Sequence, residues 1–207
     1  HGFFTESFID EAAKSAGKDS FEFRAELLQD RPRHLAVLSK AAEESDWTRP
    51  LQQGRGRGIS LQESFGSIVA QVVEVTVIEG KLSVDRVVAV IDAGIAVAPD
   101  GIAAQLESGI IYGLTAALHG EITIENGSIA QSNFDDYKSV RMDEAPKIET
   151  HIINSGHDIG GAGEPGTPGI APALANAVFD ATGLRIRQLP LGNFDLNYQA
   201  EESGEVA

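Results

Sequence analysis

The first third of the chain places apolar residues at helical spacing. Between residues 5 and 16 they fall on one side of a helix, and Gly17 follows as a stop signal. A second, short helix is expected from Asp19. A third should run from Pro32 to about residue 45, with Asp30 as its N-cap. The pattern therefore predicts three helices before residue 47.

The apolar period then changes to two. Residues 58–63, 67–78 and 81–91 are typical of strands, and Glu79-Gly80 supplies a tight turn between the last two. In the second strand valines alternate with Glu74 and Thr76, which predicts one buried face.

The next segments mix helix and strand. A long helix is expected from about Gly101 to Leu118, and its Gly109 and Gly113 indicate close packing against another backbone or a ligand. A hairpin is expected over Asn126-Gly127, joining residues 121–125 to 128–131.

A last strand is expected over 147–153 and a last helix over 168–182, with Gly183 as C-cap. Strands and helices do not alternate strictly. This order predicts an α+β fold with a mixed or antiparallel sheet and packed helices. The polar, acidic segment 193–207 is expected to be a flexible tail.

Composition narrows the function classes. The 207 residues are 42% hydrophobic and 23% charged, as in ordinary globular proteins, but the net charge is −15. Nucleic-acid binding would need a basic face, so we expect no nucleic-acid partner. No apolar run approaches the ~20 residues of a membrane span. Without cysteines, this chain alone builds no disulfide, iron–sulfur cluster or thiolate metal site.

The strongest candidate site is the glycine- and proline-rich segment from Gly160 to Pro168, which carries one carboxylate, Glu164. With Thr167 as N-cap and Pro168 as first helical residue, the carboxylate would face free N–H groups and the positive helix end. It would then stay ionised, as a general base must. The alternative is a helix-entry turn whose Glu only complements the helix dipole.

Two further features could contact a cofactor. Gly54-Arg55-Gly56-Arg57-Gly58 is expected as a flexible basic loop that could cradle a phosphate or a pterin-like ring, or could simply be solvated. Gln105 lies on the side of the long helix expected to be buried and could reach a cofactor through its amide, or be a surface residue. The five histidines show no metal-ligand spacing, so no protein metal ligand is predicted.

The segments that share a family pattern span residues 1 to about 191. They are Glu6-Ser7-Phe8-Ile9-Asp10-Glu11, Phe23-Arg24, Leu27-Leu28, Gly54-Arg55-Gly56, Gly58-Ile59, Asp92-x-Gly94, Pro99, Gln105-x-Glu107, Gly109, residues 131–137, Arg141-Met142, residues 163–168 and residues 185–190. Together they resemble the C-terminal portion of the molybdopterin-binding large subunit of the xanthine oxidase and aldehyde oxidase family. The isoquinoline 1-oxidoreductase beta subunit and bacterial aldehyde dehydrogenases are the branch it resembles most.

The resemblance implies that residues 1–192 are the C-terminal part of a molybdenum-cofactor-binding domain. Glu164 matches the family's active-site base, and Gln105 matches a glutamine that contacts the pterin. Gly56, Gly58, Ile59 and Gly163 are implied as further cofactor contacts. The implied reaction oxidises an N-heterocycle or an aldehyde with water as oxygen source. Electrons then pass to iron–sulfur clusters on a small partner subunit.

The resemblance also implies a cofactor in the molybdopterin cytosine dinucleotide form. The family's usual Asp-Cys-Gly is Asp92-Ala93-Gly94 here, and its double glycine is Ser108-Gly109. The family's large subunit is several times longer than 207 residues. We therefore expect a truncated or processed piece that needs the rest of that subunit and is inactive alone. The alternative is an orphan, non-catalytic fragment that folds and self-associates without cofactor. The compartment stays open.

Overall fold

The computed structural model describes residues 1–197. In this range the helices are α1 (Gly2–Ser15), α2 (Ser20–Leu27), α3 (Pro32–Glu44), α4 (Pro99–Leu118) and α5 (Ile170–Thr182), with a short 3-10 turn η1 (Leu191–Asn193). The strands are β1 (Arg55–Ser64), β2 (Ser67–Ile78), β3 (Lys81–Asp92), β4 (Ile124–Glu125), β5 (Ser128–Ile129) and β6 (Lys147–Ile153). The expected elements are all present; β2 and β6 have the expected ends, and the ends of the others are shifted by a few residues.

The main sheet has the strand order β1-β2-β3-β6. The first three strands form an antiparallel meander, and β6 adds to β3 in parallel after the long crossover that contains α4. The sheet is therefore mixed, which confirms the predicted α+β class.

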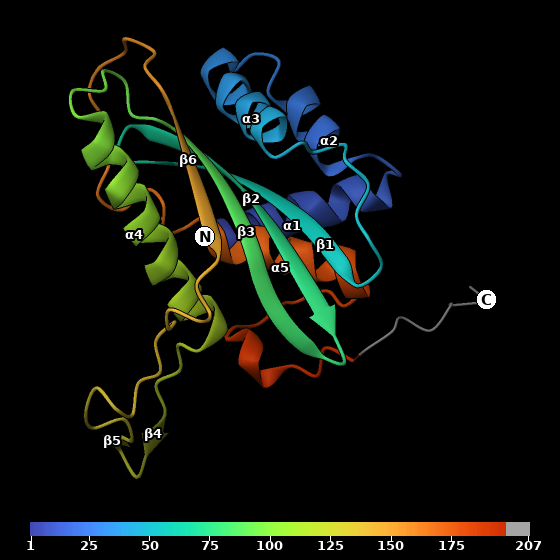
Figure 1. Ribbon diagram of the computed structural model, residues 1–207, viewed down its shortest axis with the longest axis vertical. Helices are drawn as coiled ribbons and strands as arrows, with labels where there is room; N and C mark the ends of the chain where they lie inside the picture. Colours follow the sequence, from blue (N-terminus) through green and yellow to red (C-terminus); the bar gives the residue numbers. More distant parts are fainter. Residues whose placement is uncertain (198–207) are drawn as a thin grey trace.

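Helices cover both faces of this sheet (Figure 1). α4 and α5 pack on one face, where the larger apolar core runs from β2 and β3 to both helices. α3 packs on the other face over a second core that includes Ile59 and Ile68. α1 lies beside α5 and also contacts α2 and β1. The result is a helix–sheet–helix arrangement with two apolar layers.

The prediction of one buried face on β2 was wrong, because α3 covers the second face. Glu74, expected at the surface, is only 7% exposed. Its carboxylate accepts hydrogen bonds from Arg49 and Arg57, each at 2.8 Å. A buried charge needs such partners, and here two guanidinium groups provide them.

The prediction of a flexible loop over residues 54–58 was also wrong, because β1 already begins at Arg55. Gly56 and Gly58 face α5 so closely that a Cβ on Gly58 would lie 2.2 Å from the Ala173 carbonyl oxygen. Arg57 is buried and its guanidinium bonds Glu74 and the carbonyls of Asp46, Trp47 and Arg49. Neither feature leaves a phosphate cradle at this point.

Helix starts were predicted less well than helix bodies. Asp19 caps α2 as expected, accepting hydrogen bonds from the N–H groups of Phe21 and Glu22. α3 has Arg31, not Asp30, at its N-cap position, with no side-chain cap. α5 begins at Ile170 with Gly169 as N-cap, two residues later than expected, although Gly183 ends it in the left-handed conformation at φ 76°.

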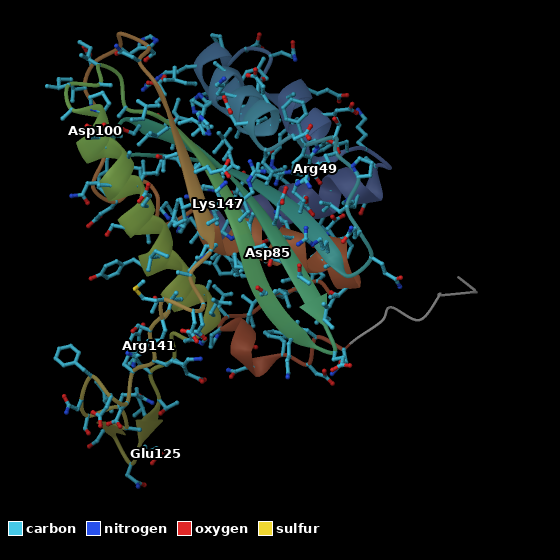
Figure 2. All side chains as sticks on the ribbon, in the orientation of Figure 1. Arg49, Asp85, Asp100, Glu125, Arg141 and Lys147 are labelled. Carbon is cyan, nitrogen blue, oxygen red and sulfur yellow. The ribbon has the colours of Figure 1, made fainter. Side chains whose placement is uncertain are left out.

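The expected hairpin over Asn126-Gly127 is confirmed but shorter, with two residues in each strand. It projects from the body of the protein, and Figure 2 shows Glu125 on it. Of the expected tail, Phe194 packs against the core and Leu196 is 5% exposed, so the segment is packed up to there. Residues 198–207 lie outside the described residues.

The contact between β1 and α5 gives a stability prediction. Gly58→Ala should lower the free energy of unfolding by about 1–3 kcal/mol, because the new methyl group must displace the α5 backbone. Chemical denaturation of both proteins measures it. In the control, Gly101→Ala on α4, the nearest atom is 3.7 Å away, so stability should be unchanged or slightly higher. Equal effects of the two substitutions would contradict the close packing.

Candidate functional site

An open pocket lies where the β1–β2 turn, α4 and the loop before α5 meet. Its volume is about 750 Å³. The lining residues are Ser64, Phe65, Gln105, Ser108, Gly109, Tyr112, Gly163, Glu164, Thr167 and Pro168. The structure thus brings together three of the residues singled out in the sequence: Gln105, Gly163 and Glu164.

Glu164 lies in a tight turn, where the N–H of Thr167 donates to the Glu164 carbonyl at 2.9 Å. The next two residues, Pro165 and Gly166, are buried, whereas Glu164 is exposed. Because α5 starts at Ile170, Glu164 precedes its first turn, and the helix dipole acts mainly within that turn. The alternative interpretation, in which Glu164 only complements the dipole of α5, is therefore less well supported by the structure than by the sequence.

Gly163 leaves the wall of the pocket open beside Glu164. A Cβ built on Gly163 would meet nothing within 4 Å. The backbone at this point can therefore be approached by a flat ligand without a side chain in the way.

α4 supplies the opposite wall. Gln105, Ser108 and Tyr112 recur at helical spacing and line the pocket from one side of the helix. Gln105 is exposed in this pocket, although the sequence analysis had placed it on the side of the helix expected to be buried. The predicted close packing of the helix glycines is confirmed, because a Cβ on Gly109 would lie 3.3 Å from the Gly166 Cα.

Phe65 is a pocket residue that the sequence reasoning missed. It sits in the β1–β2 turn with φ 54°, a conformation uncommon for a bulky side chain, and it is 65% exposed. Its carbonyl accepts a hydrogen bond from the Gly161 N–H at 2.8 Å. The Phe65-Gly66 pair between two strands was the available signal, since a two-residue hairpin turn of type I′ has positive φ at both positions, as seen here.

Gly56, Gly58 and Ile59 are not brought to this pocket. The two glycines pack against the α5 backbone, and Ile59 is fully buried in the core under α3. Cofactor contact by these three residues stays a prediction that their packing does not favour.

A buried carboxylate ties the site to the sheet. Asp92, at the end of β3, accepts two hydrogen bonds from Arg33, at 2.7 and 3.0 Å. It also accepts one from the Gly94 N–H and one from Ser155. Next to it, the carbonyl of Ala93 accepts a hydrogen bond from the Gly160 N–H at 3.0 Å. The loop that carries Glu164 is therefore anchored at its start.

The same contacts shift the acidity of Asp92. Burial acts to raise its pKa, but the hydrogen bonds from Arg33, Gly94 and Ser155 outweigh it, so the pKa lies below the ordinary 3.8.

Among residues 1–197, no group of three His, Asp or Glu side chains is arranged to hold a metal ion. The polar groups in the pocket are an amide, hydroxyl groups, open backbone and one carboxylate. This set suits the hydrogen-bonding edges of a heterocyclic ring such as a pterin, and not direct ligation of a metal.

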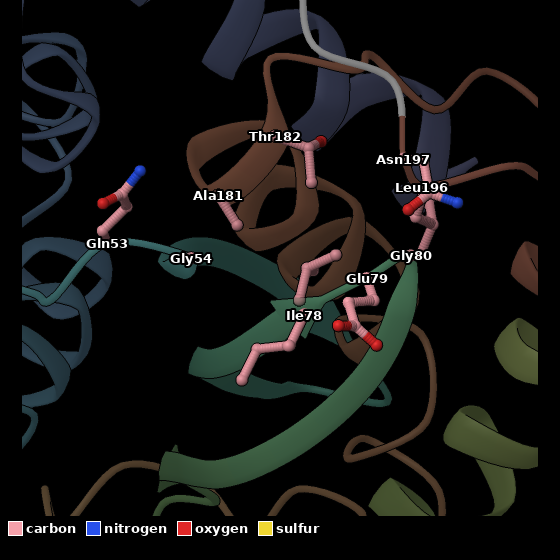
Figure 3. A pocket seen from close by; sticks show the side chains of 10 residues that line it. Gln53, Gly54, Ile78, Glu79, Gly80, Ala181, Thr182, Leu196 and Asn197 are labelled. Atoms are coloured by element: carbon pink, nitrogen blue, oxygen red, sulfur yellow. The ribbon is translucent and has the colours of Figure 1, made fainter.

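A second pocket, of about 640 Å³, lies at the other end of the sheet. Figure 3 shows Ala181 and Thr182 of α5 facing the β2–β3 turn, with Ile78, Glu79 and Gly80. Of the residues that line it, only Gly54 belongs to a candidate segment from the sequence, and neither Glu164 nor Gln105 is among them. The pocket around Glu164 therefore remains the candidate site.

Comparison with known proteins identifies the class. A family model described as the molybdopterin cofactor-binding domain matches residues 12–146. The chain belongs to this family, as the molybdopterin-binding portion of a xanthine-oxidase-type protein. The Glu164 loop lies beyond the matched range.

Curated relatives agree. The chain is 36% identical to the beta subunit of isoquinoline 1-oxidoreductase from Brevundimonas diminuta, over 91% of this chain and 25% of the relative. It is 34% identical to a nicotinate dehydrogenase subunit from Pseudomonas putida, over 92% of this chain and 18% of the relative. The chain thus spans about a quarter or less of these two proteins.

A solved structure shares the fold. The aldehyde oxidoreductase of Desulfovibrio desulfuricans superposes with a TM-score of 0.70 over 91% of this chain and 39% of that protein, at 14% identity. In the described part of the chain, no helix has the length and apolar character needed to span a membrane.

The Asp92 contacts give a pH prediction. A carboxyl whose pKa is lowered by folding stabilises the protein above its unfolded value, and this contribution is lost as pH falls through the lower folded value. Asp92→Asn should therefore lower the free energy of unfolding at pH 7 by about 1–3 kcal/mol. It should also flatten the loss of stability below about pH 4.

Denaturant unfolding from pH 2 to 7 tests this prediction. Asp143→Asn, at an exposed carboxylate, is the matched control and should leave the profile nearly unchanged. An unaltered acid slope in Asp92→Asn would show that Arg33 and Ser155 do not set the ionisation of Asp92.

Proposed function

We propose that this chain is the cofactor-binding, base-carrying part of a molybdenum hydroxylase that oxidises N-heterocycles or aldehydes with water as oxygen source. The observation that carries the proposal is the single pocket that holds Glu164, Gly163 and Gln105 together. Membership of the molybdopterin cofactor-binding family supports it. Residues 1–192 would form this part, with 193–207 as an appended segment.

In this proposal the amide of Gln105 and the open backbone at Gly163 hold the pterin. When bound, a molybdenum–pterin group would supply the oxidising centre, which would take up the two electrons removed from the substrate, with iron–sulfur clusters on a partner as the proposed acceptors. The cytosine dinucleotide form is the proposed variant.

Glu164 is the proposed general base. Its carboxylate would accept the proton from the water-derived oxygen as that oxygen attacks the electrophilic carbon of the substrate. General base catalysis needs the carboxylate within hydrogen-bond reach of that proton. Glu164 is exposed, so a substrate can reach its carboxylate. The next two residues, Pro165 and Gly166, are buried, which fixes the backbone of the turn.

The proposal includes two protein partners: the rest of a large subunit and a small iron–sulfur subunit. The open pocket has exposed aromatic side chains at its rim, with Tyr112 75% and Phe65 65% exposed. Exposed apolar groups around a pocket are typical of surfaces covered by another part of a protein.

A second candidate is a non-catalytic fragment that self-associates. Phe4 and Phe8, on one side of α1, are 71% and 70% exposed. A second copy of the chain could cover such a pair of side chains. This alternative requires no cofactor.

The catalytic prediction concerns Glu164. In the assembled enzyme, Glu164→Gln should lower kcat by at least about 100-fold, because an amide cannot accept the proton. Molybdenum content, measured by elemental analysis, should stay at the level of the unmodified enzyme. Glu125→Gln, on the projecting hairpin, is the control and should keep full activity (Figure 2). Full activity of Glu164→Gln would remove Glu164 from the mechanism.

The isolated chain gives a prediction that separates the two candidates. Alone, it should not turn over substrate with an artificial electron acceptor, because under this proposal part of the pocket and the electron path belong to the rest of the enzyme. Native purification with intact mass, metal and pterin analysis should recover molybdenum together with a larger partner. A self-associated chain of this length without molybdenum would favour the fragment.

A further inference from the structure

Three polar side chains lie on the otherwise apolar face of β1 and β2 that α5 covers. They are Ser60, Ser67 and Gln71, each with 0% exposure. Ser60 and Gln71 are direct cross-strand partners in the antiparallel ladder. Their neighbours on this face of β2 are Val69 and Val73, in the larger core. Buried polar groups destabilise a core unless they are hydrogen-bonded, so their bonds identify what they do.

All three bond to the backbone of the segment around Glu164. Ser67 Oγ donates to the Gly161 carbonyl at 2.6 Å. Gln71 Nε2 donates to the Gly166 carbonyl at 2.6 Å, and Ser60 Oγ donates to the Gly169 carbonyl at 2.7 Å. The three carbonyls lie on both sides of Glu164 in the sequence.

α4 holds the same segment from the other side. A Cβ on Gly166 would lie 2.7 Å from the Leu106 carbonyl oxygen, and Thr167 Oγ1 donates to the Gly109 carbonyl at 3.2 Å. Gly166 is therefore fixed between the Gln71 amide and the α4 backbone. The turn that presents Glu164 has little freedom to shift.

We propose that Gln71, Ser60 and Ser67 are positioning residues that fix the Glu164 turn for catalysis. None of them lines the pocket, so they act through the backbone of the loop. Gln71 carries most of this effect, because its bond is nearest to Glu164 and because both sides of Gly166 are held. This inference rests on the proposed role of Glu164 as base.

The test uses the assembled enzyme and two readouts. Gln71→Met keeps the volume but removes the donor, and should lower kcat about 100-fold while KM changes little, because a misplaced base costs turnover more than binding. Ser60→Ala and Ser67→Ala should each lower kcat about tenfold. Hydrogen exchange of the amides at 160–169 should be at least about tenfold faster in each variant.

The matched control is Ser45→Ala. Ser45 is also fully buried, and its hydroxyl donates to the Ala42 carbonyl at 3.1 Å, at the end of α3. It loses the same kind of bond without touching the Glu164 segment, so kcat and loop exchange should stay at the level of the unmodified enzyme. If Gln71→Met does not assemble, the two serine variants carry the test.

The possible failures can be told apart. If the three variants lose no more kcat than Ser45→Ala and their loop exchange is unchanged, the positioning role is wrong. If Glu164→Gln stays active, the proposed function fails instead. If, in addition, the three variants show faster exchange of the loop amides without loss of kcat, the bonds hold the loop but do not contribute to catalysis.

Discussion

The close approach of α5 to β1 is the contact on which the geometry of the site depends. Gly56 and Gly58 let the α5 backbone lie directly on the strand, closer than any side chain would permit. This fixes the height of α5 above the sheet. The loop that enters the helix is then within reach of Ser60 and Gln71, whose short bonds need that height. Bulkier residues at the glycines would lift helix and loop together.

The polar bonds under the loop are specific because their surroundings are apolar. In the core next to Val69 and Val73, a donor such as Gln71 finds few alternative acceptors. Leaving the Gly166 carbonyl or the Gln71 amide unpaired would cost about 1–3 kcal/mol for each group. Loop positions that break these bonds are therefore disfavoured, whereas a purely apolar contact would tolerate sliding.

The sequence predicted the fold well where one local pattern decides the structure. The strand over 147–153 and the turn at Glu79-Gly80 depend on alternation and turn chemistry. It failed where tertiary contacts decide. α3 covers the second face of β2, and Arg49 from the segment after α3 and Arg57 from β1 bind the buried Glu74 there. Arg55 joins the strand because β2 pairs with it, which no window of local sequence reveals.

The candidate site was predictable in part for the same reason. Glycines and prolines around Glu164, and a lone Gln105 in a glycine-rich helix, are visible along the chain. Gln71 was not singled out, because one polar residue inside a strand does not show which distant carbonyl it meets. The link between Gln71 and Gly166 spans 95 residues and exists only in the folded protein.

The pocket combines a rigid floor with an open side. Three buried donors and the α4 backbone fix the loop from below, and Asp92 with Arg33 anchors its start. Phe65 and Tyr112 stay exposed at the rim. Under the proposed function, the fixed loop and the exposed rim have different roles. A base must hold its position through every turnover, so it belongs on the packed sheet. The surface that selects the substrate can then be completed by another part of the enzyme, which covers the exposed aromatic side chains.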